Sequence, residues 1–142
     1  MNMINSTPFG RAHTLALISE IAYLQPEEAK KQAEKLGFPQ CKYYDRDGAQ
    51  AYKFENDTDV IFTCRGTEPG NLNDMLADLK ALQVKSDTVG KVHLGFKTET
   101  DDIWPMVYDD LKSLNDSKKN LWFTGHSLGG AMVTIKIGRA HV

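Results

Sequence analysis

The segment around Ser127 constrains the possible folds of this chain more than any other part of the sequence. The apolar run Leu121–Thr124 is followed by Gly125-His126-Ser127-Leu128-Gly129-Gly130, with glycines two residues before and two residues after the serine. This pattern is typical of a strand that ends in a turn too tight for side chains, with a helix beginning directly after it. We therefore expect a strand, a sharp turn at Ser127 and a helix in immediate succession.

This arrangement suits a serine nucleophile. The strained turn lifts the hydroxyl above the edge of the sheet, and the N-terminal N–H groups of the helix face the oxyanion that develops during acyl transfer. We predict that Ser127 is the nucleophile and that the Leu128 backbone N–H is one oxyanion donor. The five-residue motif alone arises by chance in roughly one chain in twenty of this length. The alternative is a glycine-rich turn whose serine only caps the helix.

The rest of the chain alternates between helical and β-type patterns. Helical spacing predicts helices over 13–24, from Pro26 to a stop at Gly37, and over 94–114, where Pro105 should kink the helix or start a new segment. Short β-type runs at 43–44 and 51–54 flank a turn signal at 45–48.

Two apolar runs, Val60–Cys64 and Leu121–Thr124, are expected to be strands buried on both faces. The alternation of helices and buried strands predicts an α/β fold with a mostly parallel sheet flanked by helices.

Composition excludes several classes of protein. A length of 142 residues fits one small domain, and a net charge of −2 gives no reason to expect nucleic acid as a partner. The N-terminus lacks the pattern of a secretory signal, and no apolar run approaches the roughly 18 residues of a membrane span. We therefore expect a cytoplasmic location, although export by a signal-free route stays open. We also expect Cys41 and Cys64 to be free thiols, Cys64 as a small buried hydrophobe.

Three more motifs precede the serine motif: Val60–Thr67, Asp74–Leu79 and Lys91–Phe96. In this order and at this spacing, the four motifs resemble the class 3 (fungal-type) lipase family, and the resemblance runs from about residue 12 to residue 136. It implies an α/β-hydrolase fold, of which this chain holds the N-terminal part. It also implies a carboxylic-ester hydrolase that acts on lipids, with no metal or organic cofactor and no obligate protein partner.

The resemblance also implies roles for individual residues. Thr67 occupies the position that supplies a second backbone N–H to the oxyanion hole, and Asp78 the position that braces the oxyanion residue through its hydroxyl. Residues 68–79 correspond to a lid that makes transient contact with a lipid surface.

Two departures from the family pattern matter. Cys64 stands where a large apolar residue is usual, and Met75 stands where the lid commonly carries a tryptophan. The polar residues Asn71, Asn73 and Asp74 leave the lid few apolar side chains for a lipid surface. An esterase for short-chain or polysaccharide-linked esters therefore stays open, as does a non-catalytic, hydrolase-like binding domain.

The histidines present in the chain do not fit the role of catalytic base. Because this fold orders its triad as Ser, then Asp or Glu, then His, we expect His93 to orient the chain entering the helix at Gly95. We expect His126 to pack or to form a hydrogen bond, and His13 to be an ordinary helix residue. The acidic pairs 101–102 and 109–110 are expected on solvated helix faces.

The fifteen residues after Ser127 contain no acidic residue and one histidine, His141. On a continued helix His141 would lie roughly 20 Å from Ser127. We therefore expect this chain to lack the triad Asp and His and to be inactive by itself.

Residues 1–136 are expected to be a partial hydrolase domain. Residues 137–142 match a translation of common sequencing-adapter DNA and are expected to be a non-native tail, the alternative being a natural short tail.

Overall fold

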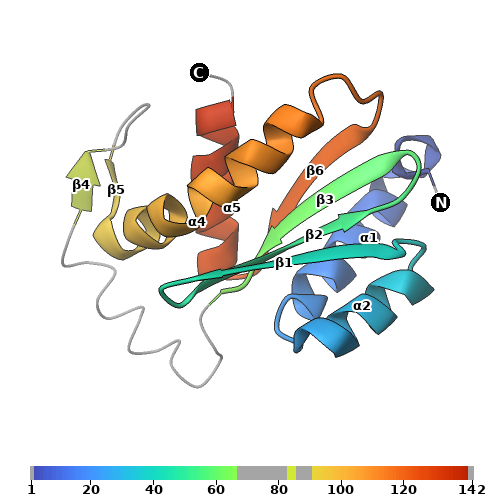
Figure 1. Ribbon diagram of the computed structural model, residues 1–142, viewed down its shortest axis with the longest axis horizontal. Helices are drawn as coiled ribbons and strands as arrows, with labels where there is room; N and C mark the ends of the chain where they lie inside the picture. The colour runs from blue at the N-terminus through green and yellow to red at the C-terminus, as the bar shows by residue number, and fades with distance from the viewer. Residues whose placement is uncertain (1, 67–82, 86–90, 141–142) are drawn as a thin grey trace.

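The computed structural model describes residues 2–66, 83–85 and 91–140. Two layers of helices enclose a sheet, with α1 and α2 on one face and α4 and α5 on the other (Figure 1). The elements are, in chain order, η1 (Met3–Asn5), α1 (Pro8–Ile21), α2 (Pro26–Lys35), β1 (Gln40–Arg46), β2 (Ala49–Glu55), β3 (Asp59–Cys64), β4 (Gln83–Lys85), β5 (Lys91–His93), α4 (Leu94–Ser113), β6 (Asn120–Gly125) and α5 (Leu128–Ala140).

The described part of the main sheet is mixed, with strand order β1-β2-β3-β6. Among the described strands of this sheet, β1 pairs antiparallel with β2, β2 pairs antiparallel with β3, and only β3 and β6 pair parallel. The α/β fold is as predicted, but the described strands form a mixed sheet rather than a mostly parallel one. The reason is the length of the connections: β1 and β2 are joined by Asp47–Gly48 alone, whereas a parallel pair needs a long crossover. Both turn residues have positive φ (51° and 88°), as a tight hairpin turn requires.

Strand β3 is the centre of the core. All six of its residues are buried, which confirms the prediction for Val60–Cys64. Phe62 packs with α4 and α5 on one face, and Ile61 packs with α1 and α2 on the other. Strand β6 is less covered than predicted, since Leu121 is 42% exposed. The reason is that β6 has only β3 as a neighbour among the described strands.

Local signals explain most helix boundaries. Helix α1 begins at Pro8, earlier than predicted, because the Thr7 side chain accepts a hydrogen bond from the Gly10 N–H and proline suits the first turn. Helix α2 ends as predicted before Gly37, which has a φ of 88°. Helix α4 runs through Pro105 as one element, so the proline does not start a new segment.

Asp59, at the start of β3, ties the N-terminus to the sheet. Its buried carboxylate accepts hydrogen bonds from the Met3 N–H (3.0 Å), the Thr58 hydroxyl (2.6 Å), the Asn120 amide (3.2 Å) and the Trp122 indole (2.8 Å). Burial by itself raises the pKa of Asp59, but these four hydrogen bonds outweigh it and lower the pKa below its usual value.

Cys41 and Cys64 form no disulfide, and Cys64 is fully buried, as predicted. Among the described helices, none combines the length and the apolar character that a membrane span requires.

Candidate active site

Ser127 lies in the two-residue turn between β6, which ends at Gly125, and α5, which begins at Leu128. Its φ is 55°, in the left-handed region that non-glycine residues rarely occupy. The sequence pattern predicted such a strained turn at this residue. A strained conformation persists only where the surrounding structure over-determines it.

The two motif glycines explain how the turn closes. A Cβ on Gly125 would lie 2.4 Å from the Gly129 carbonyl carbon and oxygen. A Cβ on Gly129 would lie 2.1 Å from the carbonyl oxygen of Cys64. The first turn of α5 therefore sits directly against the ends of β6 and β3, at distances that only glycine permits.

The start of α5 leaves a backbone donor beside Ser127. The Gly129 N–H donates to the His126 carbonyl and the Gly130 N–H to the Ser127 carbonyl, both at 3.0 Å. The Leu128 N–H belongs to the first turn, where helix geometry provides no intrahelical acceptor. The Leu128 side chain is buried in the core with Met132. This burial anchors the helix start, and the oxyanion role of the Leu128 N–H stays a prediction.

The segment that follows β3 approaches the same turn. Cys64 pairs with Gly125 in the parallel register, so Arg65 and Gly66 continue alongside His126 and Ser127. A Cβ on Gly66 would lie 2.3 Å from the His126 carbonyl oxygen. The described part of this segment ends at Gly66, beside the serine turn. Thr67 itself, Asp78 and the predicted lid 68–79 lie outside the described residues, so their predicted roles stay predictions.

The structure describes the side chains of two histidines, His13 and His126. His126 is exposed, and its Nδ1 lies 3.1 Å from the Tyr23 hydroxyl, so its predicted hydrogen-bonding role is confirmed. His13 is exposed on α1 and stacks on Phe9, as expected of an ordinary helix residue. Neither side chain forms a hydrogen bond with Ser127. His93 ends β5 directly before α4. The His93 side chain and the whole of His141 lie outside what the structure describes.

Two contacts were not foreseen from the sequence. Tyr23 reaches the serine turn from the link between α1 and α2, and no local pattern marks it. Asp110, expected on a solvated face, is only 18% exposed and accepts hydrogen bonds from Lys42 (2.7 Å) and the Tyr44 hydroxyl. Its expected solvation is therefore wrong, because α4 packs this face against β1. Burial raises the pKa of Asp110, but Lys42 and Tyr44 lower it overall.

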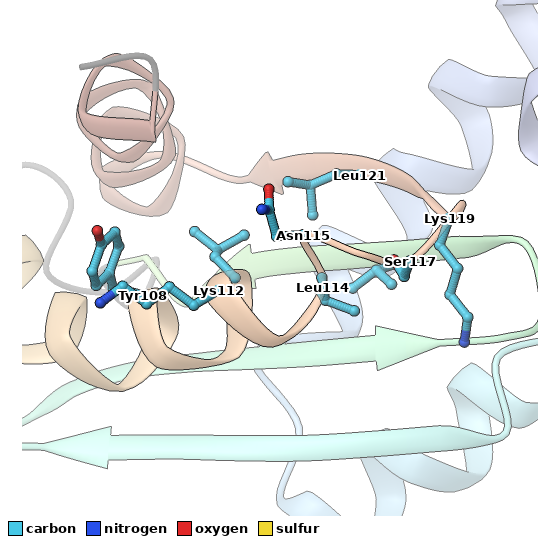
Figure 2. A pocket seen from close by; sticks show the side chains of 9 residues that line it. Tyr108, Lys112, Leu114, Asn115, Ser117, Lys119 and Leu121 are labelled. Carbon is cyan, nitrogen blue, oxygen red and sulfur yellow. The ribbon is translucent and has the colours of Figure 1, made fainter.

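A pocket of about 530 Å³ lies at the other end of the sheet (Figure 2). Its lining comes from the C-terminal half of α4, the connection from α4 to β6, and the first residues of β3 and β6: Val60, Tyr108, Leu111, Lys112, Leu114, Asn115, Ser117, Lys119 and Leu121. Ser127 follows the carboxyl end of β6, where ligands of open α/β sheets bind. This pocket is therefore not the site that Ser127 would serve.

Solved structures share this fold at low sequence identity. The chain is similar to a triacylglyceride lipase of Rhizomucor miehei, with 19% identity and a TM-score of 0.66 over 90% of this chain and 54% of that one. A lipase of Rhizopus microsporus var. chinensis gives 20% identity and a TM-score of 0.64 over 96% and 55%. A triacylglycerol lipase whose catalytic centre is formed by a serine protease triad gives 19% identity and a TM-score of 0.68. This match covers 89% of this chain and 53% of that one.

These similarities show the α/β-hydrolase fold, and the chain spans about half the length of the lipases it matches. A search of curated proteins finds no match. The family described as Lipase (class 3) matches residues 61–136, more than half of the chain. The matched range contains most of β3, the segment after it and the serine turn. The chain therefore belongs to the class 3 lipase family.

Proposed function

We propose that the whole protein is a carboxylic-ester hydrolase that acts on lipid esters, with Ser127 as its nucleophile. The observation that carries this proposal is the strained backbone of Ser127 between the end of β6 and the start of α5. A structural serine in a helix cap has no need of a positive φ, because N-cap residues ordinarily adopt extended backbone. Membership in the class 3 lipase family supports the same reaction.

In the proposed reaction, Ser127 Oγ attacks the ester carbonyl carbon and passes its proton to a histidine base. The Leu128 and Thr67 backbone N–H groups stabilise the oxyanion of the tetrahedral intermediate, and Asp78 holds the Thr67 hydroxyl. The intermediate collapses to an acyl-serine, and the alcohol leaves with the proton from the histidine. Water then attacks the acyl-serine by the same route and releases the acid. Residues 68–79 are proposed to contact the lipid surface.

A fluorophosphonate probe tests the nucleophile, because it forms a covalent bond only with an activated serine. We expect the whole protein to be labelled once, at Ser127, and the Ser127→Ala variant to remain unlabelled. Ser113→Ala is the matched control, since Ser113 lies on α4 and donates to the Asp110 carbonyl. Absent labelling of a folded wild-type protein would support a non-catalytic binding domain instead.

A series of p-nitrophenyl esters tests the substrate class. A lipase should retain or increase its rate from short to long acyl chains, above all when the substrate forms an interface. A steep fall beyond short chains would contradict the lipid substrate and favour the esterase alternative, which the polar residues Asn71, Asn73 and Asp74 suggest.

A further inference from the structure

The Tyr23 hydroxyl lies at the junction between the serine turn and the segment after β3. It is 3.1 Å from Nδ1 of His126, and the two rings meet edge to face at 6.0 Å. The same hydroxyl lies 2.8 Å from the point that a Cβ on Gly66 would occupy. One side chain from the N-terminal half of the chain therefore contacts both segments that flank Ser127.

Tyr23 is itself held in place from several directions. Its backbone N–H donates to the Glu20 carbonyl at 3.1 Å, and the neighbouring Leu24 carbonyl accepts from the Tyr52 hydroxyl at 2.8 Å. The Arg65 guanidinium lies 5.8 Å from the centre of the Tyr23 ring and donates to Gln50 Oε1 at 2.9 Å. The position of the Tyr23 hydroxyl is thus fixed by the sheet as well as by α1.

The main chain of His126, the partner of Tyr23 in this contact, is also held in place. Its carbonyl accepts from the Gly129 N–H at 3.0 Å and faces Gly66 closely. Thr124 Oγ1, two residues earlier, donates to the Leu15 carbonyl at 3.1 Å and fixes the end of β6 to α1. These contacts hold the residue before Ser127, whose strained φ must be maintained from outside.

We infer that Tyr23 is a positioning residue for Ser127 and that it acts through His126. A neutral imidazole with its proton on Nε2 accepts at Nδ1, so the Tyr23 hydroxyl donates in that tautomer. Because the His126 side chain is exposed, water could solvate it equally well without Tyr23. The hydrogen bond between Tyr23 and His126 therefore contributes through geometry. It fixes the His126 main chain, which in turn sets the direction from which Ser127 Oγ approaches the ester carbonyl carbon. This inference rests on the proposed function of Ser127.

The experiment uses the whole protein and removes each partner of this hydrogen bond in turn. Tyr23→Phe keeps the ring beside Arg65 and removes only the hydroxyl. His126→Ala removes the acceptor, and His126→Asn returns an amide oxygen near the position of Nδ1. Tyr108→Phe is the matched control, because Tyr108 is an exposed tyrosine on α4 at the other end of the sheet.

The measurements are kcat and KM on a short-chain p-nitrophenyl ester, with the rate of Ser127 phosphonylation at saturating probe. We expect Tyr23→Phe to lower kcat and the phosphonylation rate roughly tenfold while KM stays within about twofold, since aiming affects the reacting complex rather than binding. His126→Ala should lose as much, His126→Asn should recover most of the rate, and the double variant Tyr23→Phe/His126→Ala should be no slower than either single variant.

A merely structural role gives a different result. Unchanged kcat in Tyr23→Phe, losses that multiply in the double variant, or an effect confined to KM would each overturn the inference. If Tyr23→Phe does not fold, the comparison of His126→Ala with His126→Asn tests the same bond from its other end. A wild-type protein that never reacts at Ser127 overturns the proposed function and this inference together, whereas an active wild type with a fully active Tyr23→Phe overturns only this inference.

Discussion

The indole N–H of Trp122 donates to the Asp59 carboxylate at 2.8 Å, at the end of the parallel β3–β6 pair that lies away from Ser127. The same carboxylate accepts the Met3 backbone N–H. The strand that leads to Ser127 is therefore fixed to the N-terminus at its start and to α1, through Thr124, near its end. The position of Ser127 depends on contacts made along the whole length of β6.

Asp59→Asn should destabilise the protein by about 1–3 kcal/mol at neutral pH, because an amide has one acceptor oxygen where the carboxylate has two. The ionised carboxylate has a lower pKa in the folded state than in the unfolded state. Its stabilising contribution is therefore complete above the usual Asp pKa of about 3.9 and is lost as the pH falls through the lower folded value. Urea unfolding at pH 7 and below pH 4 measures both effects.

Asp57→Asn is the control for this prediction, since Asp57 is exposed in the adjacent turn. It should change the free energy of unfolding by less than about 0.5 kcal/mol. Equal effects of the two substitutions would contradict the role assigned to Asp59.

Gly129→Ala should destabilise the protein by about 3 kcal/mol or more and abolish fluorophosphonate labelling. The added methyl would lie 2.1 Å from the Cys64 carbonyl oxygen, a backbone atom that cannot move without displacing β3. Gly10→Ala is the matched control, because its Cβ would meet only side-chain atoms, the nearest being Thr7 Oγ1 at 3.3 Å. Thermal unfolding of the two variants checks the contrast, and a fully stable, labelled Gly129→Ala would refute the packing described.

Ser127→Gly should be more stable than Ser127→Ala by about 1 kcal/mol, although both lose the hydroxyl. Glycine adopts a φ of 55° without the steric cost that alanine shares with serine. The greater flexibility of glycine in the unfolded chain offsets part of this gain. Chemical denaturation of the two variants measures the difference. Equal stabilities would show that the turn is not strained at this residue.

Tyr44→Phe should destabilise the protein by about 2 kcal/mol, since it removes a hydrogen bond to the carboxylate of Asp110. The carboxylate then keeps its ion pair with Lys42. Tyr43→Phe is the control, because the adjacent Tyr43 hydroxyl donates to Asp45 in an exposed position. The control should cost less than about 1 kcal/mol. Urea unfolding of both variants would contradict the prediction if Tyr43→Phe were the more harmful.

The 142-residue chain alone should not turn over p-nitrophenyl esters, even where the whole protein does. Neither His13 nor His126 forms a hydrogen bond with Ser127, and no acidic residue follows the serine. Without an activating base the serine hydroxyl is a weak nucleophile. Steady-state rates of the two proteins at equal concentration make the comparison. Robust, Ser127-dependent hydrolysis by the short chain would refute this account.

Local pattern was sufficient for some features of the fold and insufficient for others. The buried run of β3, the stop at Gly37 and the tight turn at Ser127 each depend on neighbouring residues, so the sequence predicted them. The mixed sheet and the exposure of Leu121 depend on which strands pair, and pairing is a property of the whole chain. Tyr23 and His126 lie 103 positions apart, and no periodicity connects residues at that separation.

The connections of the sheet also determine when the serine turn is completed during folding. Strands β1, β2 and β3 are joined by turns of a few residues, so their pairing closes small loops at little entropic cost. Pairing of β6 with β3 closes a much longer loop and is correspondingly slow. The three antiparallel strands can form before β6 docks, whereas the strained conformation of Ser127 requires both β3 and β6. Reactivity at Ser127 during refolding therefore reports the pairing of β6 with β3 rather than the earlier formation of the three antiparallel strands.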